Sequence, residues 1–235
     1  MTDRAALAEL SAEIVGCRRC PRLVEWREQV ARDKVRRFRD ETYWGRPLPG
    51  FGDPEARILF LGLAPAAHGG NRTGRVFTGD ASGDFLWAAF HAQGLADRPV
   101  SRRADDGLTL TDAYIAAAVR CAPPANRPTN DERDRCAPFL VSEIRLLSEV
   151  RVIVALGQFG WDAGIRALAA LGHTMRPKPR FGHGAEAVIG RYRLIGSYHP
   201  SQQNTFTARL TVPMFDAVIA QATSLAGRSS TLTSR

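Results

Sequence analysis

The sequence is poor in lysine and has no long apolar run. Lys34 and Lys178 are its only lysines, so almost all of its 32 basic residues are arginines. No run of roughly 18 or more apolar residues is present, which excludes a typical membrane-spanning helix. The N-terminal segment MTDRAALAELSAEIVG carries charges and lacks both an apolar core and a small-residue cleavage site, so it does not resemble a secretory signal. We therefore expect a cytoplasmic, intracellular protein.

Acidic residues are also in the minority. Against the 32 basic residues stand 24 acidic ones, which gives a formal net charge of +8 at pH 7. A GC-rich genome explains the preference for arginine over lysine, but it does not explain the net charge. Because the forked guanidinium suits phosphate contacts, this charge favours a polyanionic partner.

Four short apolar runs bounded by turn residues predict buried parallel strands, at residues 57–63, 113–119, 151–156 and 192–197. Helices are expected at residues 4–15, 22–37, 82–93, 130–150, 158–171 and 210–225, with Ser82 and Thr129 as capping residues. This alternation predicts an α/β fold, a three-layer α/β/α sandwich with a central parallel four-stranded sheet. A length of 235 residues with 44% apolar content suits a single domain over residues 1–225, followed by a disordered tail at 226–235.

The expected fold also locates the site. In open α/β sheets, ligands bind at the carboxyl ends of the strands, in the loops that follow them. The distinctive loops here are residues 64–80, 120–128 and 199–209. We expect all three to meet at one rim of the sheet.

Cysteine is scarce, and its four copies form a suggestive set: Cys17, Cys20, Cys121 and Cys136. Disulfides are not expected in an intracellular protein of this size. Four separate buried thiols are possible, but Cys17 and Cys20 lie in the charged segment GCRRCPRL, a poor site for apolar burial. A four-thiolate metal site is favoured, and the spacing alone does not separate zinc from an iron–sulfur cluster.

The loop after the first strand is rich in glycine and alanine, which let a backbone approach a planar ligand closely. Phe77 is an aromatic residue in this polar loop and suggests stacking, whereas Asp80 precedes an expected helix and could simply cap it. His199 directly follows the fourth strand and could reach a ligand at the rim. Taken singly, each of these residues has an ordinary structural explanation.

Taken together, the motifs are more specific. GLAPAAHG…GRVFTGD after the first strand and HPSQQNTFT after the fourth resemble the uracil-DNA glycosylase superfamily, and more narrowly its family-5, iron–sulfur (UDGb-type) branch. The four cysteines and the segments YWGRPLPGFGDP and AAAVRCAPPANRP resemble the same branch, so the likeness spans roughly residues 17–210. It implies a structural 4Fe-4S cluster on the four cysteines. It also implies monofunctional hydrolysis of the N-glycosidic bond of uracil in DNA, the first step of base excision repair.

The resemblance further implies roles for single residues. Phe77 would stack on the flipped base, and His199 would donate a hydrogen bond to the pyrimidine O2. Asp80 would orient or activate the attacking water. The remaining contacts to the base and its surroundings would come from the backbone of Gly62, Leu63 and Ala64 and from Asn126. Related branches carry an acidic or amide residue at the position of Leu63, so its absence here shifts the handling of water to Asp80.

These residue types suit the reaction. Breaking the C1′–N1 bond leaves negative charge on uracil, and removing one donor to such an anion raises the barrier by about 2.7–4 kcal/mol. A carboxylate can stabilise the cationic sugar and take a proton from water. The base must first leave the stack, and Gln203, Phe206 and Arg209 are candidates for filling the vacated position or holding phosphates.

Leu63, Ala66 and Ala67 predict an apolar pocket floor that accepts other deaminated or modified bases, including hypoxanthine. Nothing in the pattern demands more than a monomer. The competing hypothesis is a non-catalytic protein that binds damaged DNA on the same scaffold and carries a structural zinc site.

Overall fold

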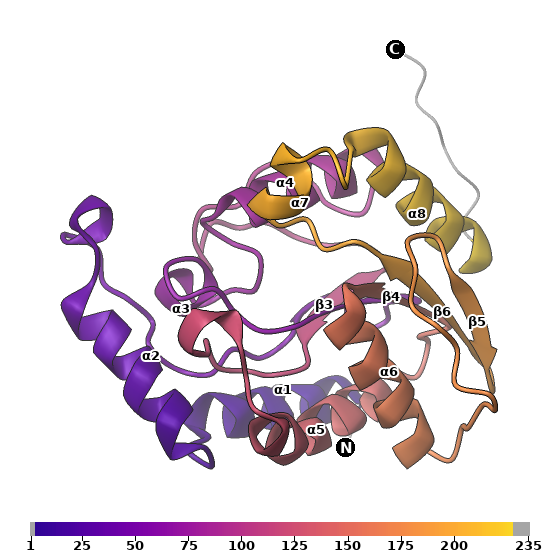
Figure 1. Cartoon of the computed structure of the whole chain (residues 1–235), viewed down its shortest axis with the longest axis horizontal. Helices are drawn as coiled ribbons and strands as arrows, with labels where there is room; N and C mark the ends of the chain where they lie inside the picture. Colours follow the sequence, from indigo (N-terminus) through magenta and orange to yellow (C-terminus); the bar gives the residue numbers. More distant parts are fainter. Residues whose placement is uncertain (1–2, 228–235) are drawn as a thin grey trace.

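The computed structural model describes residues 3–227 and contains one six-stranded sheet in the order β1-β3-β2-β4-β6-β5 (Figure 1). The strands are β1 (Phe51–Gly52), β2 (Ile58–Gly62), β3 (Ala113–Ala117), β4 (Val152–Leu156), β5 (Glu186–Ile189) and β6 (Tyr192–Ser197). The four central strands are parallel and match the four predicted apolar runs. The prediction of a four-stranded sheet was wrong at its edges, where β1 and β5 add antiparallel strands.

The composition of the strands explains this arrangement. Every residue of β2, β3 and β4 is buried, as expected for strands that are covered on both faces. β5 instead alternates, with Ala187 and Ile189 buried and Glu186 and Val188 exposed. Such a strand has one solvent-exposed face, as is common at the edge of a sheet.

Two layers of helices cover the sheet. One face packs against α4 (Ala81–Ala92) and α8 (Val212–Leu225), through residues such as Phe60, Trp87 and Phe215. The other face packs against α1 (Asp3–Gly16), α5 (Asn130–Leu146) and α6 (Gln158–Ala170), through residues such as Leu61 and Trp161. The predicted α/β/α sandwich is therefore confirmed.

The remaining elements are α2 (Pro21–Asp33) and the short helices η1 (Arg36–Phe38), α3 (Gly70–Thr73), η2 (Pro124–Asn126) and α7 (Gln202–Phe206). Figure 1 shows α2 at the margin of the molecule, and it contacts α3. The helix predicted over 22–37 ends earlier, at Asp33, and a separate turn of 3-10 helix follows. Helix α7 was not predicted.

Two helix starts bear on the site. Thr129 caps α5 in a full capping box with Glu132, as predicted. Helix α4 is capped by the Asp80 side chain, which accepts a hydrogen bond from Gly83 N at 2.9 Å, so the expectation that Ser82 caps it was wrong.

At the C-terminal end of the described chain, Ala226 is buried and its carbonyl accepts a hydrogen bond from Arg57 Nη1 at 2.9 Å. The rest of the tail predicted to be disordered, residues 228–235, lies outside the described residues. Among the helices of residues 3–227, none combines the length and the apolar character that crossing a membrane requires.

Candidate functional site

A cavity of about 380 Å³ opens at the carboxyl end of the parallel strands. We call it the rim cavity. Its walls come from the loop after β2, from η2 after β3 and from the loop after β6, so the three predicted loops do converge. The candidate residues that line it are Gly62, Leu63, Ala64, Phe77, Asp80, Asn126, His199 and Gln203. Phe206 and Arg209 are not among its lining residues.

Phe77 and His199 lie next to each other in the lining of the rim cavity, with their rings in contact. Their ring centroids are 5.6 Å apart and their planes meet at 30°. Phe77 has a left-handed backbone with φ of 51°, and its carbonyl accepts a hydrogen bond from Trp87 Nε1 at 2.6 Å. A Cβ at Gly83 would lie 2.0 Å from the same carbonyl, so this close approach requires glycine. The phenyl ring is thus held in place by its own backbone.

His199 is uncharged near neutral pH. Burial lowers the pKa of its imidazole to about 4, because removing water disfavours the charged form. A neutral imidazole offers one N–H donor and no net charge. The backbone carbonyl of His199 accepts a hydrogen bond from Asn204 Nδ2 at 2.9 Å, which ties this residue to helix α7.

The Asp80 carboxylate is held at the start of α4. Its Oδ1 accepts the hydrogen bond from Gly83 N that caps α4, and its Oδ2 lies beside Gly69, where a Cβ would be only 2.0 Å away. Burial raises the pKa of Asp80, while hydrogen bonds from Gly83 N and Ser82 N partly oppose that shift. The carboxylate is therefore positioned and partly desolvated, two conditions that strengthen a base.

The rest of the lining is mostly apolar. The carbonyls of Gly62 and Leu63 accept hydrogen bonds from Ala118 N and Val119 N at 3.0 and 2.9 Å, which fixes this segment to the continuation of β3. Asn126 is exposed at the mouth and, like Ala125 before it, has a left-handed backbone with φ of 54°.

The loop after β6 also carries side chains outside the cavity. Phe206 on α7 is 80% exposed, the most exposed of the large apolar side chains among residues 3–227. The Arg209 guanidinium stacks 4.7 Å from the Tyr198 ring centre. Neither side chain lines the rim cavity, although both closely follow its lining residue Gln203 along the chain.

The four cysteines converge from distant parts of the chain. Cys17 and Cys20 flank the turn between α1 and α2, Cys121 follows β3, and Cys136 lies in α5. All four line one small cavity, which we call the cysteine cavity, and all four are free thiols. Burial raises the pKa of Cys121 to about 12 and that of Cys136 to about 11. Among residues 3–227, no three His, Cys, Asp or Glu side chains form a group that could hold a single metal ion.

Sequence reasoning missed the buried cations around this cavity, since charged residues are ordinarily assigned to the surface. Arg27 is only 2% exposed and donates from Nη1 to Cys121 Sγ at 3.0 Å. Arg120 is 1% exposed, pairs with the equally buried Glu143, and donates from its backbone N to Cys136 Sγ at 3.3 Å. Both hydrogen bonds favour the thiolate form and partly oppose the effect of burial on the pKa of these sulfurs.

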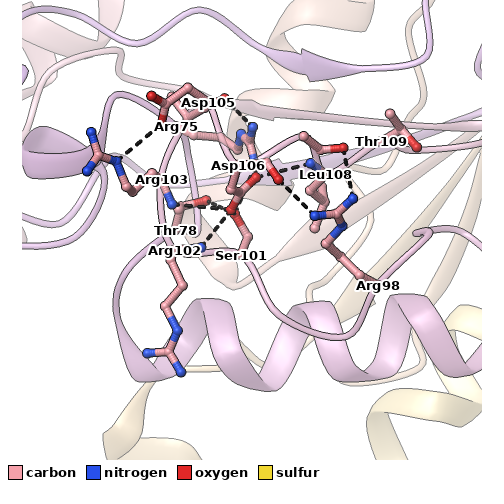
Figure 2. A network of polar contacts seen from close by, with 12 residues as sticks. Arg75, Thr78, Arg98, Ser101, Arg102, Arg103, Asp105, Asp106, Leu108 and Thr109 are labelled. Atoms are coloured by element: carbon pink, nitrogen blue, oxygen red, sulfur yellow. Dashed lines mark hydrogen bonds and ion pairs between the residues drawn. The ribbon is translucent and has the colours of Figure 1, made fainter.

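A second polar network includes residues on both sides of Phe77 in the sequence. Figure 2 shows Asp106 at its centre, with Arg75, Ser101 and Thr78 around it. Arg75 Nη1 donates to Asp106 Oδ1 at 2.8 Å, and the hydroxyls of Thr78 and Ser101 are 3.2 Å apart. Because Arg75 and Thr78 flank Phe77 closely in sequence, this network supports the conformation of the site loop.

Comparison with known proteins identifies the family. The model of the uracil DNA glycosylase superfamily matches residues 49–223. A type-5 uracil-DNA glycosylase of Mycobacterium tuberculosis is 56% identical over 224 residues, which cover 94% of this chain and 82% of that protein. Proteins of the same description from Thermus thermophilus and Pyrobaculum aerophilum are 53% and 43% identical over 226 residues, 96% of this chain in each case and 99% and 96% of those proteins. This chain therefore belongs to the uracil-DNA glycosylase superfamily.

Proposed function

We propose that this protein excises uracil from DNA by hydrolysing the N-glycosidic bond, as a monofunctional glycosylase of DNA repair. The observation that carries the proposal is the meeting of Phe77, Asp80 and His199 around one cavity, in a chain whose relatives are named uracil-DNA glycosylases. The alternative of a non-catalytic DNA-binding protein has no support from these relatives.

Recognition begins with extrusion of the nucleotide from the duplex. Phe77 stacks on the flipped base, and the backbone of Gly62, Leu63 and Ala64 contacts its edge. Asn126 at the mouth contacts the base or the sugar. The fixed backbone of Phe77 supports this assignment, because a preorganised ring loses little freedom on binding.

His199 stabilises the departing base. As the C1′–N1 bond breaks, negative charge develops on the pyrimidine, and the His199 N–H donates to O2. A neutral imidazole serves this role without needing a proton from solvent, which the lowered pKa of His199 supports. One such donor typically lowers the barrier by about 2.7–4 kcal/mol.

Asp80 acts on the sugar and on the attacking water. Its carboxylate stabilises the cationic sugar and takes a proton from the attacking water, because the aliphatic Leu63 offers no group for this purpose. Oδ1 is the oxygen that caps α4, and we assign the reaction to Oδ2. Gly69 provides the space that this oxygen needs.

The apolar lining supports a broad substrate range. Leu63 and Ala66 line the rim cavity, and neither has a polar side chain that would read the edge of uracil. We infer that hypoxanthine and modified pyrimidines are also released. Release of uracil alone from a panel of such duplexes would contradict this inference.

The loop after β6 holds the DNA while the base is flipped out. The exposure of Phe206 supports a role in filling the vacated position, and Gln203 and Arg209 supply polar and cationic contacts beside it. We propose that the protein acts as a monomer. An intracellular location accords with a DNA substrate.

We also propose a structural 4Fe-4S cluster on Cys17, Cys20, Cys121 and Cys136. The residues fit it: four free thiols share one cavity, two of them accept hydrogen bonds, and the Arg27 guanidinium supplies buried positive charge. The choice of an iron–sulfur cluster over zinc rests on the resemblance of this cysteine arrangement to the iron–sulfur branch of the family. Cys17 and Cys20 before α2, Cys121 after β3 and Cys136 in α5 would hold the cluster, which would link these segments and take no part in base release.

Two measurements test the proposal. Wild-type protein should release uracil from a duplex with one U·G mismatch and leave an alkali-labile abasic site. Purified protein should be brown, contain iron rather than zinc, and lose its visible absorbance when Cys121 is replaced by serine. Colourless, zinc-loaded protein that binds this DNA without releasing the base would favour the alternative.

A further inference from the structure

A second cavity of about 370 Å³ adjoins the rim cavity. We call it the outer cavity. One wall consists of Trp26 from α2 with Arg37 and Phe38 from η1, and the opposite wall is the site loop around His68. The two cavities share Ala66, Asp80 and Asn126. They therefore meet at the point where the proposed mechanism places the sugar of the flipped nucleotide.

The wall formed by Phe38 is tied firmly to the site loop. The Arg72 guanidinium lies 3.9 Å from the Phe38 ring centre. Arg72 is buried and donates to the carbonyls of His68 and Gly79, both at 2.8 Å. Since His68 and Gly79 themselves line the outer cavity, both walls are held by the same side chain. The cavity is thus a built feature rather than a gap between loose segments.

The outer cavity has an available cation. Arg37 is exposed, and its guanidinium stacks on the Phe38 ring, 4.9 Å from the ring centre. Within residues 3–227 no carboxylate pairs with Arg37 or with the adjacent Arg36, whereas Arg39 pairs with Asp40 at 3.5 Å. Burial and the charge of Arg72 lower the pKa of His68, so Arg37 is the cation of this cavity near neutral pH.

We propose that the outer cavity binds the DNA backbone next to the flipped nucleotide, with the Arg37 guanidinium on a flanking phosphate of the same strand. The inference rests on the proposed function. A flipped nucleotide stays joined to its neighbours through its phosphates, so the strand must continue from the shared wall into an adjoining space. A guanidinium stacked on an aromatic ring is oriented in advance for such a contact. The Asp80 carboxylate at the shared wall disfavours a phosphate there, which places the phosphate toward Arg37.

The test compares Arg37→Gln with Arg191→Gln. Arg191 is an exposed arginine stacked on Tyr192 at the start of β6, at the opposite end of the strand from the rim, which makes it a matched control. Binding to a duplex with a tetrahydrofuran abasic analogue is measured over a range of salt. We expect the slope of log K against log salt to fall by about 1 for Arg37→Gln and to stay unchanged for Arg191→Gln.

A second experiment locates the phosphate. Single methylphosphonates are placed at each phosphate flanking the analogue, and wild type is compared with Arg37→Gln on each duplex. The affinity loss from Arg37→Gln should vanish at one flanking position, since the partner charge is already gone there. An unchanged salt slope, or the same loss on every duplex, would overturn the proposal. Failure of the proposed function would look different, because wild type would then release no base from the U·G duplex.

Discussion

Replacing Asp106 by asparagine tests how the site loop is held. Asp106 Oδ1 accepts hydrogen bonds from Arg75 Nη1 at 2.8 Å and Leu108 N at 3.1 Å. Its Oδ2 accepts from Ser101 Oγ at 2.9 Å, Arg102 N at 2.7 Å and Arg103 N at 3.2 Å (Figure 2). Asparagine keeps the shape but removes the charge, and it leaves Arg75 without its carboxylate in a site where the guanidinium is only 5% exposed.

The expected loss follows from that burial. Breaking a buried ion pair by removing one partner costs about 3–5 kcal/mol. The Asp106 side chain retains 18% exposure, which places the loss near the lower end, at about 3 kcal/mol. For a chain of this length, such a loss lowers Tm by about 6–12 °C. Urea denaturation should show a lower midpoint with an unchanged slope.

The effect depends on pH in a definite direction. Burial alone would raise the pKa of Asp106, but hydrogen bonds from Leu108 N, Arg75 and the backbone N–H groups of Arg102 and Arg103 lower it below its usual range. A lowered pKa in the folded state stabilises the protein above the pKa of the unfolded state, about 3.9, and this contribution is lost as the pH falls through the folded pKa. The difference between wild type and Asp106→Asn should therefore shrink below about pH 4.

The adjacent Asp105 provides the control. It pairs with Arg103 at 3.2 Å, but both side chains are 75% exposed, so Asp105→Asn should leave the urea midpoint unchanged. Asp106→Asn should also slow base release, because Arg75 supports the backbone that presents Phe77. Equal midpoints for the two variants would refute the reasoning.

Three further predictions concern the rim cavity and the loop after β6. Gly69→Ala should slow single-turnover base release by about 100-fold, because the added Cβ would displace Asp80 Oδ2. The control is Gly16→Ala, whose added Cβ meets nothing within 4 Å and should leave the rate unchanged. Equal rates for the two variants would count against the placement of Asp80. Phe206→Ala should leave the urea midpoint unchanged and weaken excision from duplex DNA by about 10-fold, a larger loss than on single-stranded DNA. The control is Val188→Ala, at an exposed position on β5. An equal loss on both substrates would contradict the role of Phe206 in filling the vacated position. Because burial lowers the pKa of His199 to about 4, the unfolded state takes up a proton that the folded state resists between about pH 6.5 and 4. Wild type should therefore lose stability relative to His199→Gln as the pH falls through this range, and parallel urea midpoints would refute the burial of this imidazole.

The central strands were predictable because burial on both faces leaves a continuous apolar run. The same logic missed β5, whose Glu186 and Val188 face solvent, and β1, which has only two residues in a segment of glycine and proline. Their pairing depends on neighbouring strands rather than on local composition. Helix α7 was hidden for a similar reason, since its five residues are polar apart from Phe206.

For the candidate site, the sequence predicted which residues meet but not the contacts that hold them. The topology of a parallel sheet brings its loops to one rim, so the convergence of Phe77, Asp80 and His199 could be anticipated. The hydrogen bond that anchors Asp80 and the burial of Arg27 depend on tertiary contacts and leave no local pattern. Neither the outer cavity nor the network around Asp106 could be inferred, because each joins segments far apart in the sequence.

The most direct test is the single-turnover rate of uracil release from a U·G duplex by wild type, Asp80→Asn and Asp84→Asn. Asparagine can still cap α4, so the substitution at position 80 removes the carboxylate without removing the cap. Asp84 is an exposed carboxylate in the first turn of the same helix and serves as the control. We predict rapid release by wild type and Asp84→Asn and a loss of at least about 100-fold for Asp80→Asn. No release by cluster-loaded wild type, or equal rates for all three proteins, would contradict the account.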